Sequence, residues 1–208
     1  FDGDGYKISN LSVTTEGSNA GLFGRLETGS SVKDLTIENA QINGGYMYSG
    51  ALAGYVNASV TNCAVKNSRV TGANNYTGGL FAYGGSAAAV SGCRVENTTV
   101  TGTSYVGGLV GTTSKDVKNS YALRTTVTAT GDYVGGLVGN TAAGLTIENV
   151  FVRGGSVTGK NYVGGILGYK NGGYQTIKNT YAAVSVTATG GDGGLLVGYS
   201  SLYPTPAS

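Results

Sequence analysis

The hydrophobic residues of this chain occur in short strings that return at a nearly constant interval. The most regular string is Gly-Leu-x-Gly, usually preceded by Tyr-x-Gly, and it occurs in seven close copies. Successive central aliphatic residues are separated by 30, 28, 29, 28, 29 and 29 positions. They are Leu22, Leu52, Leu80, Leu109, Leu137, Ile166 and Leu195. Self-similarity at one fixed period predicts a repeat architecture of seven units of about 29 residues.

Two further strings lie between successive copies of this motif. One is an aliphatic residue followed two positions later by Asn or Asp, and the other is Val-Thr-Gly or a close variant. The polar position of the first string holds Asn10, Asp34, Asn62, Asn119, Asn149 and Asn179, with Gly92 in the fourth copy. All strings alternate apolar with small or polar residues, which is typical of β-strands. Gly, Asn and Asp between them favour turns.

One such repeat cannot bury its own apolar face, whereas repeats stacked at the strand spacing of roughly 4.8 Å bury a continuous column. We therefore predict an all-β fold, a single parallel β-helix of about seven coils over residues 1–201. Like residues then stack on like, so the Asn side chains are expected to hydrogen-bond along their column. Two other folds fit the pattern less well. A β-propeller needs blades of about 40 residues, which is longer than this repeat, and a sandwich does not require similar strings at a fixed interval. Residues 202–208 contain two prolines and are expected to be a linker.

Composition and charge narrow the class of protein. Gly accounts for 38 of 208 residues, but there are only 2 Pro, which excludes collagen. Only 12 % of residues are charged, which is atypical of a disordered chain. The net charge of +2 is scattered, so no nucleic-acid partner is expected. The chain contains no run of 18 apolar residues, so the sequence predicts no membrane insertion. The chain starts at Phe1 without a visible signal peptide, so we expect a fragment of a longer precursor with flanking domains.

The seven motif copies resemble the GLUG motif, a repeat of bacterial surface proteins that include adhesin-like proteins and immunoglobulin-A-specific metallopeptidases. The resemblance covers about residues 1–200, and the opening Phe1–Leu11 is similar to the first coil of pectin-lyase-like proteins. It implies a right-handed β-helix, secreted or on a bacterial cell surface, without catalysis, because the zinc domain of those peptidases has no counterpart motif here. Departures are Ala51, Ala82 and an apparent one-residue insertion within 194–198.

Candidate chemistry is sparse. The chain has no His, which removes the commonest general base and zinc ligand, so we expect no catalytic residues, no metal and no cofactor. Carboxylates remain as candidates, since glycosidases work with paired acids. The repeat predicts that Glu38 and Glu148 occupy equivalent positions on coils that are four apart. It places Asp132 and Asp192 in the same turn of the repeat on coils that are two apart. We interpret all four as solvated turn residues.

Two other pairs of residues carry structural expectations. Asp2 and Asp4, in Asp-Gly-Asp-Gly, are expected to serve a turn rather than to bind calcium, which needs six or more oxygen ligands. Cys63 and Cys93 occupy the same repeat position on adjacent coils. They are expected about 5 Å apart, within reach of a disulfide, but we favour two buried free thiols.

Two columns are candidate ligand-binding surfaces. The first is predicted to stack as an aromatic ladder and consists of Tyr48, Tyr76, Tyr105, Tyr133 and Tyr162. Tyrosine stacks on sugar faces and anchors interfaces; the alternative is that these residues only brace a turn. The second comprises Thr99, Thr101, Thr126 and Thr128, continued by Ser156, Thr158, Ser185 and Thr187. It resembles the ice-binding face of some antifreeze proteins, although Arg69 and Gln41 interrupt it and Thr suits any exposed strand.

The functional hypothesis is a non-catalytic, adhesin-like surface domain that binds a host or environmental glycan or protein. The main alternative is a spacer with no ligand of its own. A polysaccharide-acting enzyme and an ice-binding surface are further alternatives.

Overall fold

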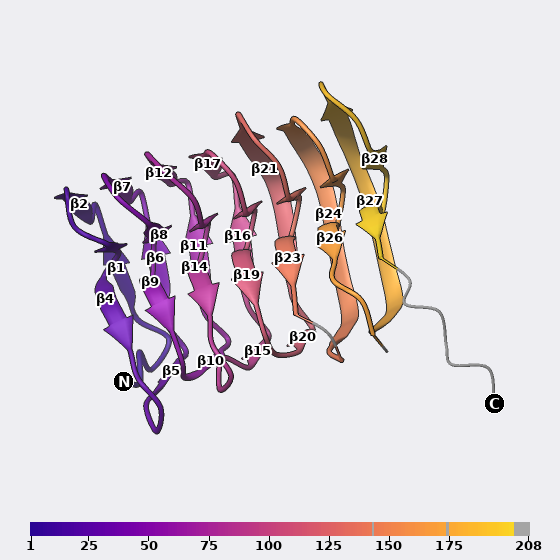
Figure 1. The fold of residues 1–208 in the computed structure, drawn as a ribbon. Coiled ribbons are helices and arrows are strands. Elements are labelled where there is room, and N and C mark those ends of the chain that lie inside the picture. Colours follow the sequence, from indigo (N-terminus) through magenta and orange to yellow (C-terminus); the bar gives the residue numbers. More distant parts are fainter. Residues whose placement is uncertain (143, 174, 202–208) are drawn as a thin grey trace.

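The computed structural model describes residues 1–142, 144–173 and 175–201. These residues form 29 strands and the turns between them, with no helix. Every strand pairs in parallel with its counterpart on the next coil, and the chain winds through seven coils from the N-terminal to the C-terminal end (Figure 1). The predicted parallel β-helix is thus confirmed. The predicted linker at 202–208 lies outside the described residues, and the right-handed sense stays a prediction.

The largest of the three sheets, sheet 1, has 15 strands. It takes three short strands from each of the second, third and fourth coils. The last two of these merge into β21 in the fifth coil, which keeps β20 separate, and all three merge into β24 and β27 in the sixth and seventh. Its strands are β1 (Lys7–Ser9), β2 (Ser12–Thr15), β5 (Ser31–Lys33), β6 (Thr36–Glu38), β7 (Gln41–Gly44), β10 (Ser59–Thr61), β11 (Ala64–Lys66), β12 (Arg69–Gly72), β15 (Val90–Ser91), β16 (Arg94–Glu96), β17 (Thr99–Gly102), β20 (Val117–Lys118), β21 (Tyr121–Ala129), β24 (Thr146–Gly159) and β27 (Thr176–Ala188).

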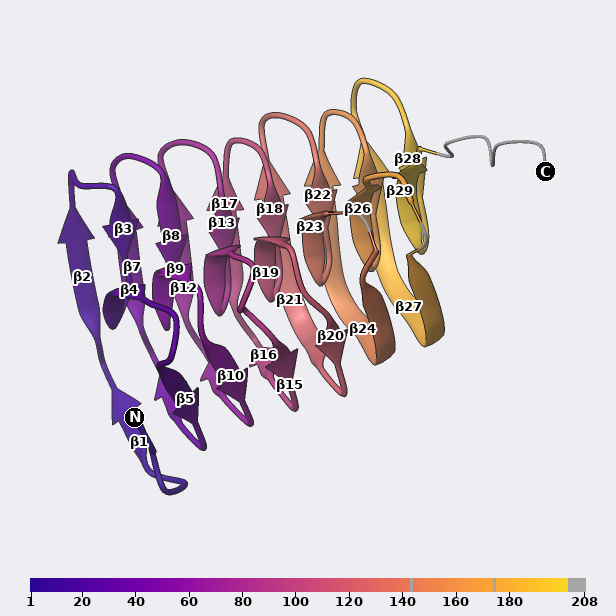
Figure 2. The same cartoon turned by 60° about the horizontal axis from the view of Figure 1, so that its bottom comes forward.

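Two sheets of seven strands each complete every coil (Figure 2). Sheet 2 holds the residues that precede Gly-Leu-x-Gly: β3 (Asn19–Ala20), β8 (Tyr48–Gly50), β13 (Thr77–Gly78), β18 (Val106–Gly107), β22 (Val134–Gly135), β25 (Val163–Gly164) and β28 (Gly193–Gly194). Sheet 3 begins at the end of the motif: β4 (Phe23–Leu26), β9 (Ala53–Val56), β14 (Phe81–Gly84), β19 (Val110–Thr113), β23 (Val138–Thr141), β26 (Leu167–Lys170) and β29 (Val197–Ser200).

The central aliphatic residue of the motif forms the middle of the core. Leu52, Leu80, Leu109, Leu137 and Ile166 are fully buried, and each donates its backbone N–H to the aliphatic residue of the next coil. The glycines beside them are required sterically, since a Cβ on Gly135 would lie 1.8 Å from the carbonyl oxygen of Val138. A side chain at this position therefore forces the coil open.

The last copy of the motif corrects one sequence prediction. Leu167 pairs with Val197 and Gly164 pairs with Gly194, so residues 194–198 contain no insertion. Leu196, not Leu195, lies beside Ile166 and accepts its backbone N–H. Leu195 instead replaces the second glycine and is 56 % exposed on the terminal coil. Counting motif letters misplaced the residue because two leucines stand side by side.

The first corner of each coil has left-handed backbone and is occupied by the first asparagine column: Asp34, Asn62, Gly92, Asn119, Asn149 and Asn179. The expected ladder is present, with Asn149 donating to Asn119 at 3.1 Å and Asn179 donating to Asn149 at 3.0 Å. Gly92 interrupts it. Asn10 was assigned to this column wrongly, because Ile8 pairs with Ile37 rather than with Val32.

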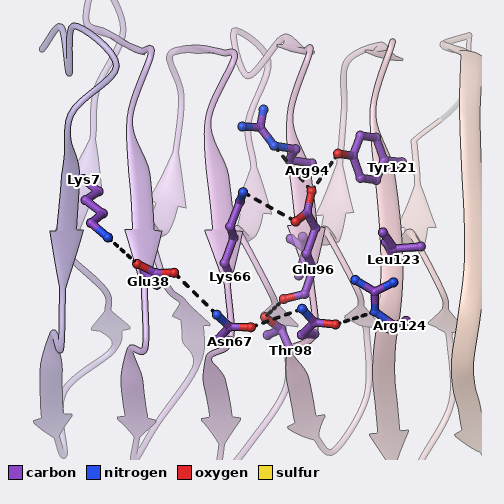
Figure 3. Close-up of polar contacts among 12 residues, drawn as sticks. Lys7, Glu38, Lys66, Asn67, Arg94, Glu96, Thr98, Tyr121, Leu123 and Arg124 are labelled. Atoms are coloured by element: carbon purple, nitrogen blue, oxygen red, sulfur yellow. Dashed lines mark hydrogen bonds and ion pairs between the residues drawn. The ribbon is translucent and has the colours of Figure 1, made fainter.

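A second left-handed corner follows, and the sequence patterns did not reveal it. This second asparagine column consists of Asn10, Asn39, Asn67, Asn97, Arg124 and Gly154. Asn97 donates to Asn67 at 3.1 Å, and the guanidinium of Arg124 donates to Asn97 at 2.6 Å (Figure 3). Both of these corners are therefore built by side-chain hydrogen bonds that run along the stacking direction.

Cys63 and Cys93 lie side by side in the core as free thiols, as expected. Each Sγ faces a backbone carbonyl of the preceding coils, that of Val32 at 3.8 Å for Cys63 and that of Val60 at 3.5 Å for Cys93. The hydrogen bond with Cys63, together with burial, raises the pKa of the Cys93 thiol well above its usual value. The same hydrogen bond lowers the pKa of the Cys63 thiol. Both side chains pack as small, buried residues in the core.

Candidate functional site

The predicted tyrosine ladder lies at the third corner of the coils, between sheets 1 and 2. Tyr48 begins β8, and the other four tyrosines immediately precede β13, β18, β22 and β25. Successive ring centroids along this corner tyrosine column (Tyr48, Tyr76, Tyr105, Tyr133 and Tyr162) are 5.3, 4.7, 4.6 and 5.2 Å apart. The side chains are half-buried. The sequence thus places five aromatic rings in one continuous stack.

Four of these tyrosines adopt a backbone conformation that bulky residues rarely take. Their φ angles are 62° for Tyr76, 58° for Tyr105, 64° for Tyr133 and 55° for Tyr162. A non-glycine residue in this region costs about 1 to 3 kcal/mol, and Asn tolerates it better than most. One stacked aromatic pair stabilises by roughly 0.5 to 1.5 kcal/mol. Stacking therefore does little more than offset the backbone strain.

Stacking also determines which atoms a ligand can reach. The rings from Tyr76 to Tyr162 lie within 16 to 24° of parallel, so their faces cover one another. A sugar cannot stack on ring faces inside such a column, contrary to the simplest form of the sequence hypothesis. The edges and phenolic hydroxyls remain. Burial, followed by the neighbouring tyrosines, raises the pKa of Tyr48, Tyr76, Tyr105 and Tyr133, so these hydroxyls stay protonated donors at neutral pH.

A second outward-facing column runs beside the first on sheet 3. Strand register places in it Arg25, Tyr55, Tyr83, Thr112, Asn140, Tyr169 and Tyr199. Tyr55 stacks on Tyr83 and Tyr169 stacks on Tyr199. Ring edges of this flanking column meet the corner tyrosines, as for Tyr133 and Tyr169 at 5.2 Å and 89°. The sequence analysis missed it, although each member directly follows the last residue of a Gly-Leu-x-Gly copy.

The threonine array lies on sheet 1, on the strands that precede the corner tyrosines along the chain. Thr99 pairs with Thr126 and Thr101 pairs with Thr128, and the rows continue through Ser156 and Thr158 on β24 and Ser185 and Thr187 on β27. Gln41 and Arg69 occupy the same row as Thr99 on the second and third coils. The strands are in register on these coils as well, but both rows hold Thr or Ser without interruption only from the fourth coil onward.

The candidate glutamates do not occupy the equivalent positions that the repeat predicted. Glu38 pairs with Ser9 and Lys66 in the second strand segment of the coil, whereas Glu148 pairs with Lys118 and Lys178 in the first segment. Both lie in the tetrapeptide Thr-Ile-Glu-Asn, which marks either of two left-handed corners. The prediction of equivalent positions was therefore wrong.

The aspartates also lie in different columns. Asp132 accepts a hydrogen bond from the side chain of Asn161 at 2.9 Å. Asp192 aligns with Tyr162, one position further along the coil, since Val163 pairs with Gly193. Asp2 forms an ion pair with Lys33 at 2.7 Å and accepts the backbone N–H of Asp4 at 3.0 Å, in agreement with a turn role. The hydrogen bond from Lys33 lowers the pKa of Asp2.

Glutamates on sheet 1 have polar partners on neighbouring coils (Figure 3). Lys7 donates to Glu38 at 2.9 Å, and this hydrogen bond lowers the pKa of that carboxyl. Glu96 accepts the hydroxyl of Tyr121 at 2.7 Å and forms an ion pair with Lys66 at 3.6 Å. Across the described part of the chain, no three His, Cys, Asp or Glu side chains gather in a way that could hold a metal ion.

Sheet 1 carries another aromatic ladder that the sequence analysis did not identify. Tyr121 stacks on Phe151 at 4.7 Å, and Phe151 stacks on Tyr181 at 5.3 Å. These three residues lie within extended strands, not at a left-handed corner. They form an aromatic stack similar to the corner column but without its backbone strain.

Comparisons with known proteins support the fold more than the function. No protein-family model matches the chain, so membership of the GLUG-motif family stays a prediction. A crystal structure from Bacteroides ovatus, provisionally described as an immunoglobulin A1 protease, superimposes with a TM-score of 0.62 over 97 % of this chain and 68 % of that chain. At 17 % sequence identity this likeness shows the β-helix fold alone.

One curated relative matches a short segment. Halomucin from Haloquadratum walsbyi is 46 % identical over 46 residues, which are 22 % of this chain and, to the nearest per cent, 0 % of that protein. The match thus covers a small fraction of either protein. Among the described residues there is also no helix long and apolar enough to cross a membrane.

Proposed function

We propose that this chain is a non-catalytic, adhesin-like binding module of a secreted or cell-surface protein, and that it binds a glycan along the corner tyrosine column. The observation that carries the proposal is the left-handed backbone of Tyr76, Tyr105, Tyr133 and Tyr162. Strained residues persist where the surrounding structure enforces them, and they concentrate at functional sites. Asn, which fills the other two corners, would fit this backbone with less strain.

The chemistry exposed along the column suits a sugar ligand. Tyrosine edges offer both apolar C–H groups and a hydroxyl that donates and accepts hydrogen bonds. The spacing of about 5 Å between ring centroids presents several such groups in a row. An extended glycan that lies along the coils would contact several of them at once, and several weak contacts add to a useful affinity.

The test is binding of fluorescently labelled protein to an array of neutral and charged glycans, followed by titration calorimetry with each glycan that binds. The variant Tyr105→Asn/Tyr133→Asn keeps a residue suited to left-handed backbone and removes two rings. We expect it to lose affinity by at least about tenfold. The matched control, Tyr121→Asn/Phe151→Asn, makes a comparable change in the other aromatic ladder and should bind as the wild type does.

Three results would contradict the proposal. Binding by no glycan on the array would favour the spacer hypothesis. Equal losses in the two double variants would indicate that aromatic residues act only through stability. Binding that is unaffected by either double variant but falls for Thr126→Val would assign the ligand to the threonine array.

A further inference from the structure

The flanking column has one interruption, and a notch opens there in the surface. Tyr55 and Tyr83 occupy the third position of β9 and β14, and Tyr169 and Tyr199 that of β26 and β29. On the two coils between them the position holds Thr112 and Asn140. The notch has a volume of about 210 Å³ and is lined by Tyr105, Tyr133, Asn140, Tyr169 and Asn171.

The interruption exposes aromatic surface that is covered elsewhere. Tyr76 meets the ring of Tyr83, and Tyr162 meets the rings of Tyr169 and Tyr199. Tyr105, in contrast, contacts only its stacking neighbours Tyr76 and Tyr133 among the rings of the described residues. Its outer edge therefore faces the notch.

Part of one ring face is also available. Tyr199 stacks on one side of Tyr169 at 5.4 Å, and the strand on the other side presents Asn140. The Asn side chain is shorter than a tyrosine and reaches only the base of the neighbouring ring. The outer part of the Tyr169 face is thus the wall of the notch on which a sugar ring can stack.

Polar groups lie at the base of this wall. The side-chain nitrogen of Asn140 donates to Oγ1 of Thr112 at 3.2 Å, which fixes the orientation of the amide. Oγ1 of Thr112 in turn donates to the backbone carbonyl of Asn140 at 3.2 Å. The carbonyl oxygen of the Asn140 amide remains as an acceptor, and the hydroxyls of Tyr105 and Tyr133 supply donors. An apolar face beside a few oriented polar groups is the usual composition of a small-molecule site.

Charge and size narrow the ligand class. None of the five lining residues is charged, and Asp132, beside Tyr133, adds negative potential that contributes to the raised pKa of both Tyr105 and Tyr133. This environment disfavours sulfated, sialylated or uronic sugars. At about 30 Å³ per water molecule, 210 Å³ corresponds to about seven waters. That space suits one sugar ring and is below the 300 Å³ or more of typical drug-sized pockets.

We propose that this notch is the specificity subsite of the module and recognises one neutral pyranose residue. The Tyr169 ring stacks on the sugar, and Asn140, Tyr105 and Tyr133 hydrogen-bond its hydroxyls. The inference rests on the proposed glycan-binding function and adds to it a location and a sugar class. It also explains why the glycan would bind at one place on a column of repeated tyrosines.

The decisive variant is Asn140→Tyr, which continues the flanking column and fills the notch. We expect it to fold as the wild type does and to lose affinity for neutral array glycans by at least about tenfold. Arg153→Tyr, an exposed strand position on sheet 1, is the matched control and should bind normally. Should Asn140→Tyr fail to fold, judged by circular dichroism, Asn140→Ala removes the acceptor without adding volume and should also weaken binding.

A site-resolved measurement separates this inference from the broader proposal. Methyl pyranosides of glucose, galactose, mannose and N-acetylglucosamine are titrated into ¹⁵N-labelled protein while the side-chain amide of Asn140 is followed by NMR. Saturable shifts at Asn140 with at least one neutral glycoside, and none with sialic acid, support the notch. Glycan binding that survives Asn140→Tyr but falls with Tyr105→Asn/Tyr133→Asn overturns the notch and leaves the proposed function standing. Absence of all glycan binding by the wild type overturns both.

Discussion

The asparagine corners and the tyrosine corner have the same left-handed backbone but different side chains. At Asn119, Asn149 and Asn179 the φ angles lie between 51 and 54°, and at Tyr105 and Tyr133 they are 58 and 64°. From Asn119 to Asn179 in the first asparagine column, the side-chain amides bond one another from coil to coil. In the corner tyrosine column the rings stack, and their hydroxyls remain as hydrogen-bonding groups. The same local geometry thus supports one corner built for cohesion and another that presents functional groups.

The two corners can also be compared by the free energies of their side-chain contacts and of their backbone strain. An amide ladder contributes about 0.5 to 1.5 kcal/mol per hydrogen bond, which is similar to the gain from one stacked ring pair. The backbone strain, however, is smaller for Asn than for Tyr. An asparagine at the tyrosine corner would therefore be at least as stabilising. Stability alone does not account for the tyrosines, which is why we look to binding.

The largest expected effect is at the asparagine corner. Asn149→Ala removes one ladder bond to each neighbouring coil and leaves a Cβ at positive φ without a compensating side-chain bond. We expect a loss of about 2 to 3 kcal/mol in the free energy of unfolding, measured by urea denaturation. Asn149→Gly relieves the backbone and should lose about 1 to 2 kcal/mol less than Ala. Equal losses for Ala and Gly would show that left-handed strain is unimportant at these corners.

The next largest effect is expected at the tyrosine corner, which can be compared directly with the asparagine corner. Tyr105→Asn exchanges two stacking contacts for reduced strain, so the free energy of unfolding should change by less than about 1 kcal/mol. Urea denaturation under the conditions used for Asn149→Ala provides the measurement. A loss of more than about 2 kcal/mol would instead support the alternative that the tyrosines only brace the turn, and would remove the main argument for a binding role.

Features that repeat with the period could be predicted from the sequence. Features that depend on the register of a segment within its coil could not. The fold and the stacked tyrosines follow from the spacing of Gly-Leu-x-Gly. The two Thr-Ile-Glu-Asn segments, around Glu38 and Glu148, show the limit. Their local sequence specifies a left-handed corner but not which corner, because that choice depends on how many strands precede it in the coil.

The flanking column illustrates a different limit. Its members follow the motif at a constant offset, so the positions of Thr112 and Asn140 were visible in the sequence. Their meaning depends on the outward direction of the third residue of each sheet 3 strand and on its edge contact with the corner tyrosines. Strand alternation alone does not give that contact, because it joins two sheets across a bend of the coil. The notch therefore required the three-dimensional structure.

The smallest effect concerns pH, and it distinguishes the two corners by chemistry. Burial and neighbouring rings raise the pKa of Tyr48, Tyr76, Tyr105 and Tyr133, whereas asparagine does not titrate. The folded protein holds these phenolic protons more tightly than the unfolded chain, whose tyrosines titrate near pH 10. The resulting stability is complete below about pH 10 and is lost as pH rises through the folded pKa values.

Urea midpoints measured from about pH 8 to pH 11 should therefore be flat at first and then fall. Tyr105→Phe keeps the ring stack and removes one ionisable hydroxyl, so its midpoint should fall less steeply in the alkaline range. Asn149→Gly should lower the midpoint by the same amount at every pH, because no titrating group is removed. If Tyr105→Phe fell as steeply as the wild type, the phenols would be as accessible to water in the folded as in the unfolded chain. The corner tyrosine column would then be a loosely packed surface rather than an ordered stack that presents its hydroxyls.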